Sequence, residues 1–124
     1  MAKIFLDANV VIDILEQRKE TSLSSLNNHQ TYMSPLSLHI FFYVEKKKVP
    51  YIPLSSFMTN NNIVDITEDL AQKALIGPTS DFEDNIQLHS AAEAECDTFL
   101  TSDKQLLDIK FFGKTQIISP ENLK

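Results

Sequence analysis

Three aspartates occupy positions where a carboxylate can take part in chemistry. Asp7 directly follows the apolar run 4–6, and Asp103 closely follows a second apolar run, 98–101. Asp84 lies 19 residues before Asp103, in the first turn of a predicted helix that leads into the second run. A helix and a return loop fit within that spacing. Because ligands bind at the carboxyl ends of strands in open α/β sheets, we expect the three acids to share one edge of a sheet.

Carboxylates that lie close together repel one another, so a cluster of this kind usually either holds a proton or binds a metal ion. Hard oxygen ligands at a half-open site suit Mg²⁺ or Mn²⁺. The matching chemistry is metal-assisted attack of water on a phosphodiester. Acids in the first turn of a helix are also favoured by the helix dipole, so Asp84 alone is a weaker candidate than Asp7 or Asp103.

Other polar residues near these positions are candidates for supporting roles. Asn9 is expected either to cap the first helix or to join the site. Thr101 and Ser102 could orient the last acid or bind an ion through water, although hydroxyl groups are common at strand ends. His39 lies on a largely apolar predicted helix, where it is either a hydrogen-bonded core histidine or, as a functional residue, a softer metal ligand or a contact to phosphate when protonated.

The elements that must position these residues alternate along the chain. Apolar patterning predicts strands at 3–6, 31–33, 63–66, 98–101 and 116–118. Helices are predicted at 9–17, 35–44, 51–58, 68–76 and 81–94, with one helical turn near 106 and a weak helix and loop over 21–30. Ser80 is expected to cap the helix that carries Asp84. Strands alternating with helices predict an α/β fold with a parallel sheet and helices on both faces.

Size and composition limit the classes of protein that fit. A chain of 124 residues, 43% of them hydrophobic, predicts a single domain over 1–124 with a substantial core. The net charge of −6 argues against binding nucleic acid by general electrostatics, but not against a nuclease whose acids hold metal. The lone Cys96 cannot form an intramolecular disulfide. The longest apolar run is too short to cross a membrane, and we expect a cytoplasmic protein.

Four segments, in this order, resemble a PIN domain: IFLDANVVIDIL, SPLSLHIFFYV, DFEDNIQLHSAAEAECDTFLTSD and IISPENL. The nearest relatives would be the toxin-like bacterial PIN proteins related to VapC. The resemblance covers essentially the whole chain and implies a three-layer α/β/α sandwich with a central, mostly parallel sheet. It also implies a Mg²⁺- or Mn²⁺-dependent ribonuclease that acts on RNA.

The resemblance assigns roles residue by residue. Asp7, Asp84 and Asp103 match the acids that bind metal in the family. Asn9 and Thr101 match the polar residues that accompany them, and Asp81 corresponds to an extra acid on the same side of the helix as Asp84.

The chain departs from the family pattern at one position. Many PIN nucleases carry a glutamate on the helix that starts here at Pro35, and the matching position is taken to be His39. Glu45 lies about 240° round the helix from His39 and is a poor replacement. The loss of a carboxylate implies weaker metal binding, so the activity is less certain than the fold.

The main hypothesis is therefore a metal-dependent endoribonuclease, the toxin of a toxin–antitoxin pair, with an antitoxin as partner and a homodimer as a common family assembly. The alternative is a degenerate PIN domain that binds RNA or protein without cutting, which His39 favours. A phosphate-transfer domain with Asp7 as nucleophile ranks below both, because Asn9 stands where a phosphatase would have a second acid.

Overall fold

A six-stranded sheet forms the centre of the computed structural model, which describes residues 2–18 and 24–123. The strand order is β3-β2-β1-β4-β6-β5, and every neighbouring pair is parallel except β5 with β6. The strands are β1 (Lys3–Leu6), β2 (Gln30–Met33), β3 (Asn62–Ile63), β4 (Thr98–Leu100), β5 (Phe111–Phe112) and β6 (Thr115–Ile118).

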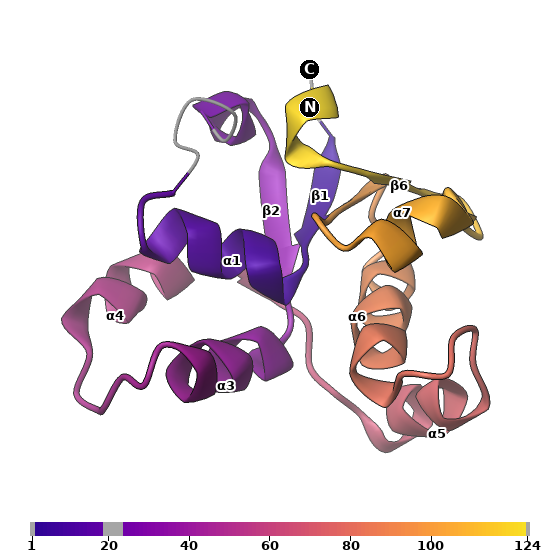
Figure 1. Ribbon diagram of the computed structural model, residues 1–124, viewed down its shortest axis with the longest axis horizontal. Helices are drawn as coiled ribbons and strands as arrows, with labels where there is room; N and C mark the ends of the chain where they lie inside the picture. The colour runs from indigo at the N-terminus through magenta and orange to yellow at the C-terminus, as the bar shows by residue number, and fades with distance from the viewer. Residues whose placement is uncertain (1, 19–23, 124) are drawn as a thin grey trace.

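Helices cover both faces of the sheet, as the alternating pattern predicted. Figure 1 shows α1, α3 and α4 on one side of the central strands and α5, α6 and α7 on the other. The helices are α1 (Ala8–Leu15), α3 (Pro35–Val44), α4 (Ile52–Thr59), α5 (Glu68–Ile76), α6 (Phe82–Glu93) and α7 (Lys104–Ile109), with 3₁₀ turns η1 (Ser24–Asn28) and η2 (Pro120–Asn122). No helix in the described ranges is long and apolar enough to span a membrane.

The central strand β1 supplies both hydrophobic cores. Alternate residues of a strand point to opposite faces of its sheet. Ile4 and Leu6 accordingly pack into the core beneath α1 and α3, whereas Phe5 enters the core beneath α6 and α7. There the ring of Phe5 stacks on that of Phe99, with 5.5 Å between the ring centres. The buried residues of β1, 4–6, are all apolar, as a strand covered on both faces requires. The polar residues Lys3 and Asp7 stand at the two ends of this run.

Two strands differ from the sequence-based expectation. The predicted strand 63–66 pairs with β2 only over Asn62–Ile63, with one further bond from the Val64 N–H to the Met33 carbonyl at 2.8 Å. The hairpin partner β5 was not predicted, because a two-residue strand has no detectable period. Part of the predicted weak helix over 21–30 lies outside the described residues, and η1 forms in the remainder.

The third helix is less buried than its composition predicted. Leu, Ile and Phe surround most of α3, yet Ser37 and Phe41 are its only fully buried residues. Tyr43 is 79% exposed and Val44 is 53% exposed. The helix packs against α1 on one side, and its C-terminal turn presents an apolar surface to solvent.

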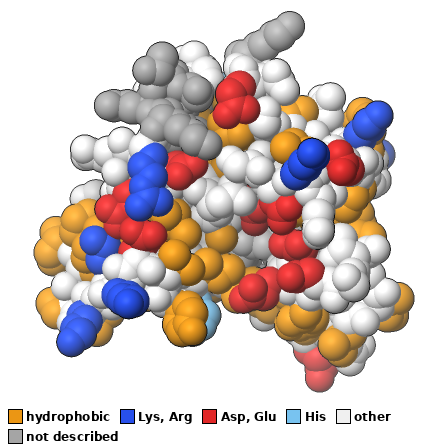
Figure 2. Space-filling view, viewed as in Figure 1, with side chains coloured by type: hydrophobic (Ala, Val, Ile, Leu, Met, Phe, Trp, Pro, Cys, Tyr) orange, Lys and Arg blue, Asp and Glu red, His pale blue; other side chains and the backbone are white. Residues whose placement is uncertain are grey.

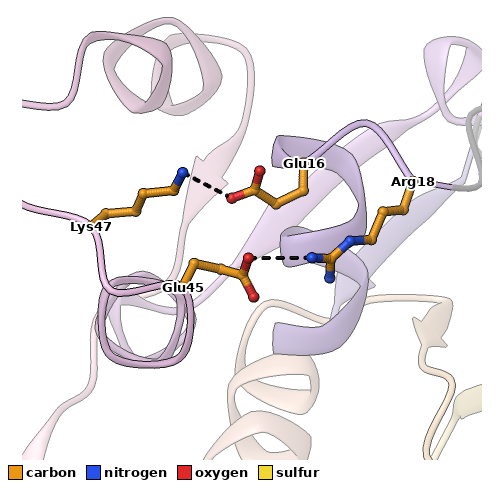
Figure 3. A network of polar contacts seen from close by, with 4 residues as sticks. All are labelled: Glu16, Arg18, Glu45 and Lys47. Carbon is orange, nitrogen blue, oxygen red and sulfur yellow. Dashed lines mark hydrogen bonds and ion pairs between the residues drawn. The ribbon is translucent and has the colours of Figure 1, made fainter.

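Two ion pairs join the end of α1 to the turn after α3 (Figure 3). Glu16 Oε1 lies 3.3 Å from Lys47 Nζ, and Glu45 Oε1 lies 3.2 Å from an Arg18 guanidinium nitrogen. The hydrogen bond and charge of Glu16 raise the pKa of Lys47. Exposed pairs contribute little stability because solvent screens them, but these two determine which cations of this region remain unpaired.

Candidate active site

Asp7 stands between β1 and α1 and is itself the N-cap of α1. The prediction that Asn9 caps this helix is wrong, because the backbone is still extended at Asp7 and turns helical at Ala8. Asp7 Oδ1 accepts the Ala8 N–H at 2.9 Å. Its Oδ2 accepts the Thr101 hydroxyl at 2.7 Å and the Asn9 side-chain amide at 3.2 Å. With 5% exposure, the carboxylate is held in one orientation.

Thr101 connects the ends of two neighbouring parallel strands, β1 and β4. Besides donating to Asp7, its oxygen accepts the Asp103 N–H at 3.0 Å and lies 3.3 Å from the Asn9 amide nitrogen. Asn9 Oδ1 accepts the backbone N–H of Ser102 at 3.1 Å. The predicted supporting residues Asn9, Thr101 and Ser102 thus meet around Asp7, with Ser102 contributing its backbone in this contact.

The other acids lie at the N-termini of helices α6 and α7. Asp103 caps α7, and its Oδ1 accepts the N–H two residues further on at 2.9 Å. Asp81 caps α6, where Ser80 had been expected, and accepts the Asp84 N–H at 2.9 Å. Asp81 is exposed at the start of this helix, whereas Asp84, one turn later, is partly buried.

Asp7, Asp84 and Asp103 line one hollow of about 220 Å³ at the carboxyl edge of the sheet. Acidic side chains surround this hollow in the middle of the face drawn in Figure 2. A larger cleft of about 550 Å³ opens beside α1 and α4, but none of the three acids lines it. The smaller hollow is the candidate site because the three predicted acids line it. Its lining consists of Asp7, Ala8, Asn9, Ile12, Ile40, Glu83, Asp84, Gln87 and Asp103.

The electrostatics of the hollow favour a bound cation. Burial, followed by the negative charges of the neighbouring carboxylates, Asp81 first, raises the pKa of Asp84 to about 7. Burial also raises the pKa of Asp7, against the opposing effect of its hydrogen bonds. Among the described residues, no lysine or arginine lines the hollow. Negative charge is therefore concentrated here without an internal counterion.

The donor set fits a hard divalent cation by its chemistry, because carboxylate oxygens are the ligands that Mg²⁺ and Mn²⁺ prefer. Within residues 2–18 and 24–123, however, no three acidic, histidine or cysteine side chains converge closely enough to hold one ion together. Because hydrogen bonds fix the Asp7 carboxylate, the side chains of Asp84 and Asp103 would have to move toward it to bind the same ion. Catalytic geometry in ligand-free sites is often looser than in complexes.

The structure places His39 outside the candidate site. His39 is exposed and does not line the hollow, so it is not a core histidine. The residue of α3 that lines the hollow with the acids is Ile40. Successive helix residues point about 100° apart, so neighbouring residues of α3 differ in this respect. Glu45 cannot substitute, because it pairs with Arg18 outside the hollow.

Two buried amides on α6 were missed by sequence reasoning. Gln87 lines the hollow, accepts the Ser34 hydroxyl at 2.7 Å and donates to the Ser37 hydroxyl at 2.7 Å, which ties α6 to the start of α3. Asn85 bonds both the backbone and the hydroxyl of Thr79 and so shapes the loop before Asp84. A signal was present, since both amides stand among the apolar residues of a largely buried helix. The partners of Gln87, Ser34 and Ser37, are however distant in sequence.

The raised pKa of Asp84 predicts a pH-dependent stability. The folded protein holds the Asp84 proton more tightly than the unfolded chain, so stability is highest below the ordinary pKa near 4 and falls as the pH rises toward about 7. In EDTA, Asp84→Asn is therefore expected to raise the melting temperature at pH 8 by about 5 °C and to change it little at pH 4.

Thermal unfolding at the two pH values checks this prediction, with the exposed Asp108→Asn as the control of equal charge change. Equal stabilisation by Asp84→Asn at both pH values would contradict it.

Comparisons with known proteins agree with this architecture. No family model matches the sequence, and no curated protein sequence matches it. Among solved structures, it is similar to a chain of VapBC2 from Rickettsia felis, crystallised bound to a DNA fragment from their promoter. The TM-score is 0.68 at 16% identity, over 94% of this chain and 98% of that chain. Likeness at this identity shows the fold, and the predicted VapC-like PIN fold is confirmed.

Proposed function

We propose that this chain is a metal-dependent endoribonuclease that hydrolyses RNA phosphodiesters, and that it is the toxin of a toxin–antitoxin pair. The observation that carries the proposal is the hollow in which Asp7, Asp84 and Asp103 meet without an internal cation. These acids come from three separate segments of the chain. The likeness to VapBC2 supports an antitoxin protein as the partner.

In this proposal Asp7, Asp84 and Asp103 would hold Mg²⁺ or Mn²⁺. When bound, such a cation lowers the pKa of water and offsets negative charge on a phosphate. Thr101 and Asn9 keep the Asp7 carboxylate in position, since both donate hydrogen bonds to it. Asp84, with its pKa near 7, is partly protonated at neutral pH and must release that proton before it can act as a ligand.

A non-catalytic PIN-fold binding module is the second candidate, and Ile40 is the observation that favours it. An isoleucine at the α3 position facing the acids supplies no ligand and leaves one wall of the hollow apolar. In this case the remaining acids would attract a basic side chain of a partner.

Cleavage of a structured RNA pool separates the two candidates. We expect cutting by the purified protein, freed from any partner, in Mg²⁺ or Mn²⁺ and none in EDTA. Calorimetric titration of each metal into the same protein gives a readout that does not depend on turnover. Folded protein that binds neither metal and cuts no RNA would refute the nuclease and leave the binding module.

A further inference from the structure

Among the residues that the structure describes, four cations gather at one place in a chain whose net charge is −6: Arg18 after α1, and Lys46, Lys47 and Lys48 after α3. Two of them are neutralised, since Arg18 pairs with Glu45 and Lys47 with Glu16 (Figure 3). Lys46 and Lys48 are exposed, and no described residue forms an ion pair with either. An unpaired positive charge therefore remains at the end of α3.

Two exposed aromatic side chains lie on α3 close in sequence to the residue that lines the acidic hollow. His39 and Tyr43 are four residues apart on α3, so they share one face of the helix. Both are exposed, Tyr43 by 79%. Ile40, next to His39, lines the acidic hollow. Figure 2 shows the same order across this face, with blue side chains over the α3 and α4 side, hydrophobic surface next, and red side chains around the hollow.

The spacing suits a short piece of nucleic acid. Val44, the last residue of α3, is four residues beyond Ile40, which is about 6 Å along the helix. Stacked nucleotides rise by about 3.4 Å each, so this distance corresponds to about two nucleotides. A strand with its reacting phosphate at the acids would therefore reach the end of α3, and the two lysines follow directly in the chain.

We propose that His39, Tyr43, Lys46 and Lys48 form a binding track for single-stranded RNA that leads to the acidic hollow. The inference rests on the proposed nuclease function and names how its substrate is held. Exposed aromatic rings stack bases, and unpaired lysines attract phosphates by charge complementarity. RNA is a polyanion, and the carboxylates of the hollow repel it. The lysines of the track would supply the attraction that holds it near the hollow.

Other occupants fit this face less well. In a symmetric contact between two copies of this chain that is centred on these lysines, the lysines of one copy would face those of the other, which costs energy through like-charge repulsion. A protein partner would suit Val44, Val49 and Ile52, which are also exposed, but it would have to supply an acidic group for each lysine. Single-stranded RNA supplies such groups at every phosphate of its backbone.

Fluorescence anisotropy with a 12-nucleotide, fluorescein-labelled single-stranded RNA tests the track on the full chain in EDTA, where no metal-dependent cutting occurs. The double variant Lys46→Glu/Lys48→Glu is expected to weaken binding at least tenfold. Loss of two phosphate contacts should also reduce the slope of log affinity against log salt by about 1.4. Tyr43→Ala should weaken binding by about tenfold, and Tyr43→Phe should retain it.

The matched control is Lys110→Glu/Lys114→Glu, which makes the same charge change at exposed positions outside α3. The proposal is overturned if the two double variants lose RNA affinity equally, or if the track variants lose none. A protein partner would then be the better occupant of this face. Because binding and cutting are measured separately, RNA that binds along the track but is not cleaved refutes the nuclease and supports the track. If the protein cleaves RNA but the track variants bind RNA as tightly as the wild type, the nuclease is supported and the track is refuted.

Discussion

Asp7→Asn is expected to reduce metal-dependent RNA cleavage by about 100- to 1000-fold while making the metal-free protein more stable. The substitution keeps the shape of the side chain and an oxygen that can still accept the Ala8 N–H, as Asp7 does at 2.9 Å. It removes the charge that would hold the cation. Cleavage of the RNA pool in Mn²⁺, with Asp108→Asn as the control, measures the first effect.

The gain in stability follows from burial. Asp7 is 5% exposed, and burial raises the pKa of its carboxyl group above the ordinary value. The folded state therefore favours the protonated form, and stability is lost as the pH rises above the pKa of the unfolded chain. A neutral amide carries no such cost at neutral pH. In EDTA the variant should melt at a higher temperature than the wild type at pH 7.5, and the difference should shrink at pH 4.

Either half of this prediction can fail separately. Undiminished cleavage would show that the acids of the hollow are not the catalytic site. A variant less stable than the wild type at pH 7.5 would show that the hydrogen bonds from Thr101 and Asn9 outweigh the cost of burying the charge.

Ile40→Glu is expected to raise the affinity for Mn²⁺ at least tenfold and to increase cleavage. The side chain at this position lines the hollow with the three acids, and affinity for hard cations depends on the charge and number of the ligands. Without metal, the fourth carboxylate should raise the pKa of Asp84 further and destabilise the protein at neutral pH. Isothermal titration calorimetry gives the affinity directly.

For metal binding His39→Glu is the matched control, because it adds a carboxylate at the neighbouring residue, which does not line the hollow. We expect little change in Mn²⁺ affinity for this variant. If the two variants bind Mn²⁺ equally well, the assignment of Ile40 as the residue that faces the acids is incorrect.

The parts of the fold that the sequence predicted are those with a local signal. The apolar run 4–6 ends at Asp7 because a strand covered on both faces tolerates no polar side chain. The edge strands β3 and β5 have two residues each, and they exist only because a neighbour pairs with them. The exposure of Tyr43 depends on what lies over α3, which no property of α3 itself determines.

In the candidate site, too, the features with a local sequence signal were predicted and those that depend on distant contacts were not. Asp7, Asp84 and Asp103 were predicted to share one edge because strand ends in a parallel sheet converge there, and the structure brings them to one hollow. Their roles as ligands stay a prediction. The lining by Ile40 was not predicted, because which residue of α3 faces the acids depends on the rotation of the helix about its axis, at 100° per residue. Gln87 was missed because its partners, Ser34 and Ser37, are distant in sequence.

The short strands at both edges of the sheet restrict how another protein can recognise this chain. β-Augmentation, in which a partner adds its own strand to an exposed edge, depends on a row of unpaired backbone groups. At each edge this sheet offers only the two residues of β3 or of β5. A partner that adds a strand would therefore gain few backbone hydrogen bonds here. Inhibitors of this protein are better designed to contact its helix surfaces and side chains than to extend its sheet.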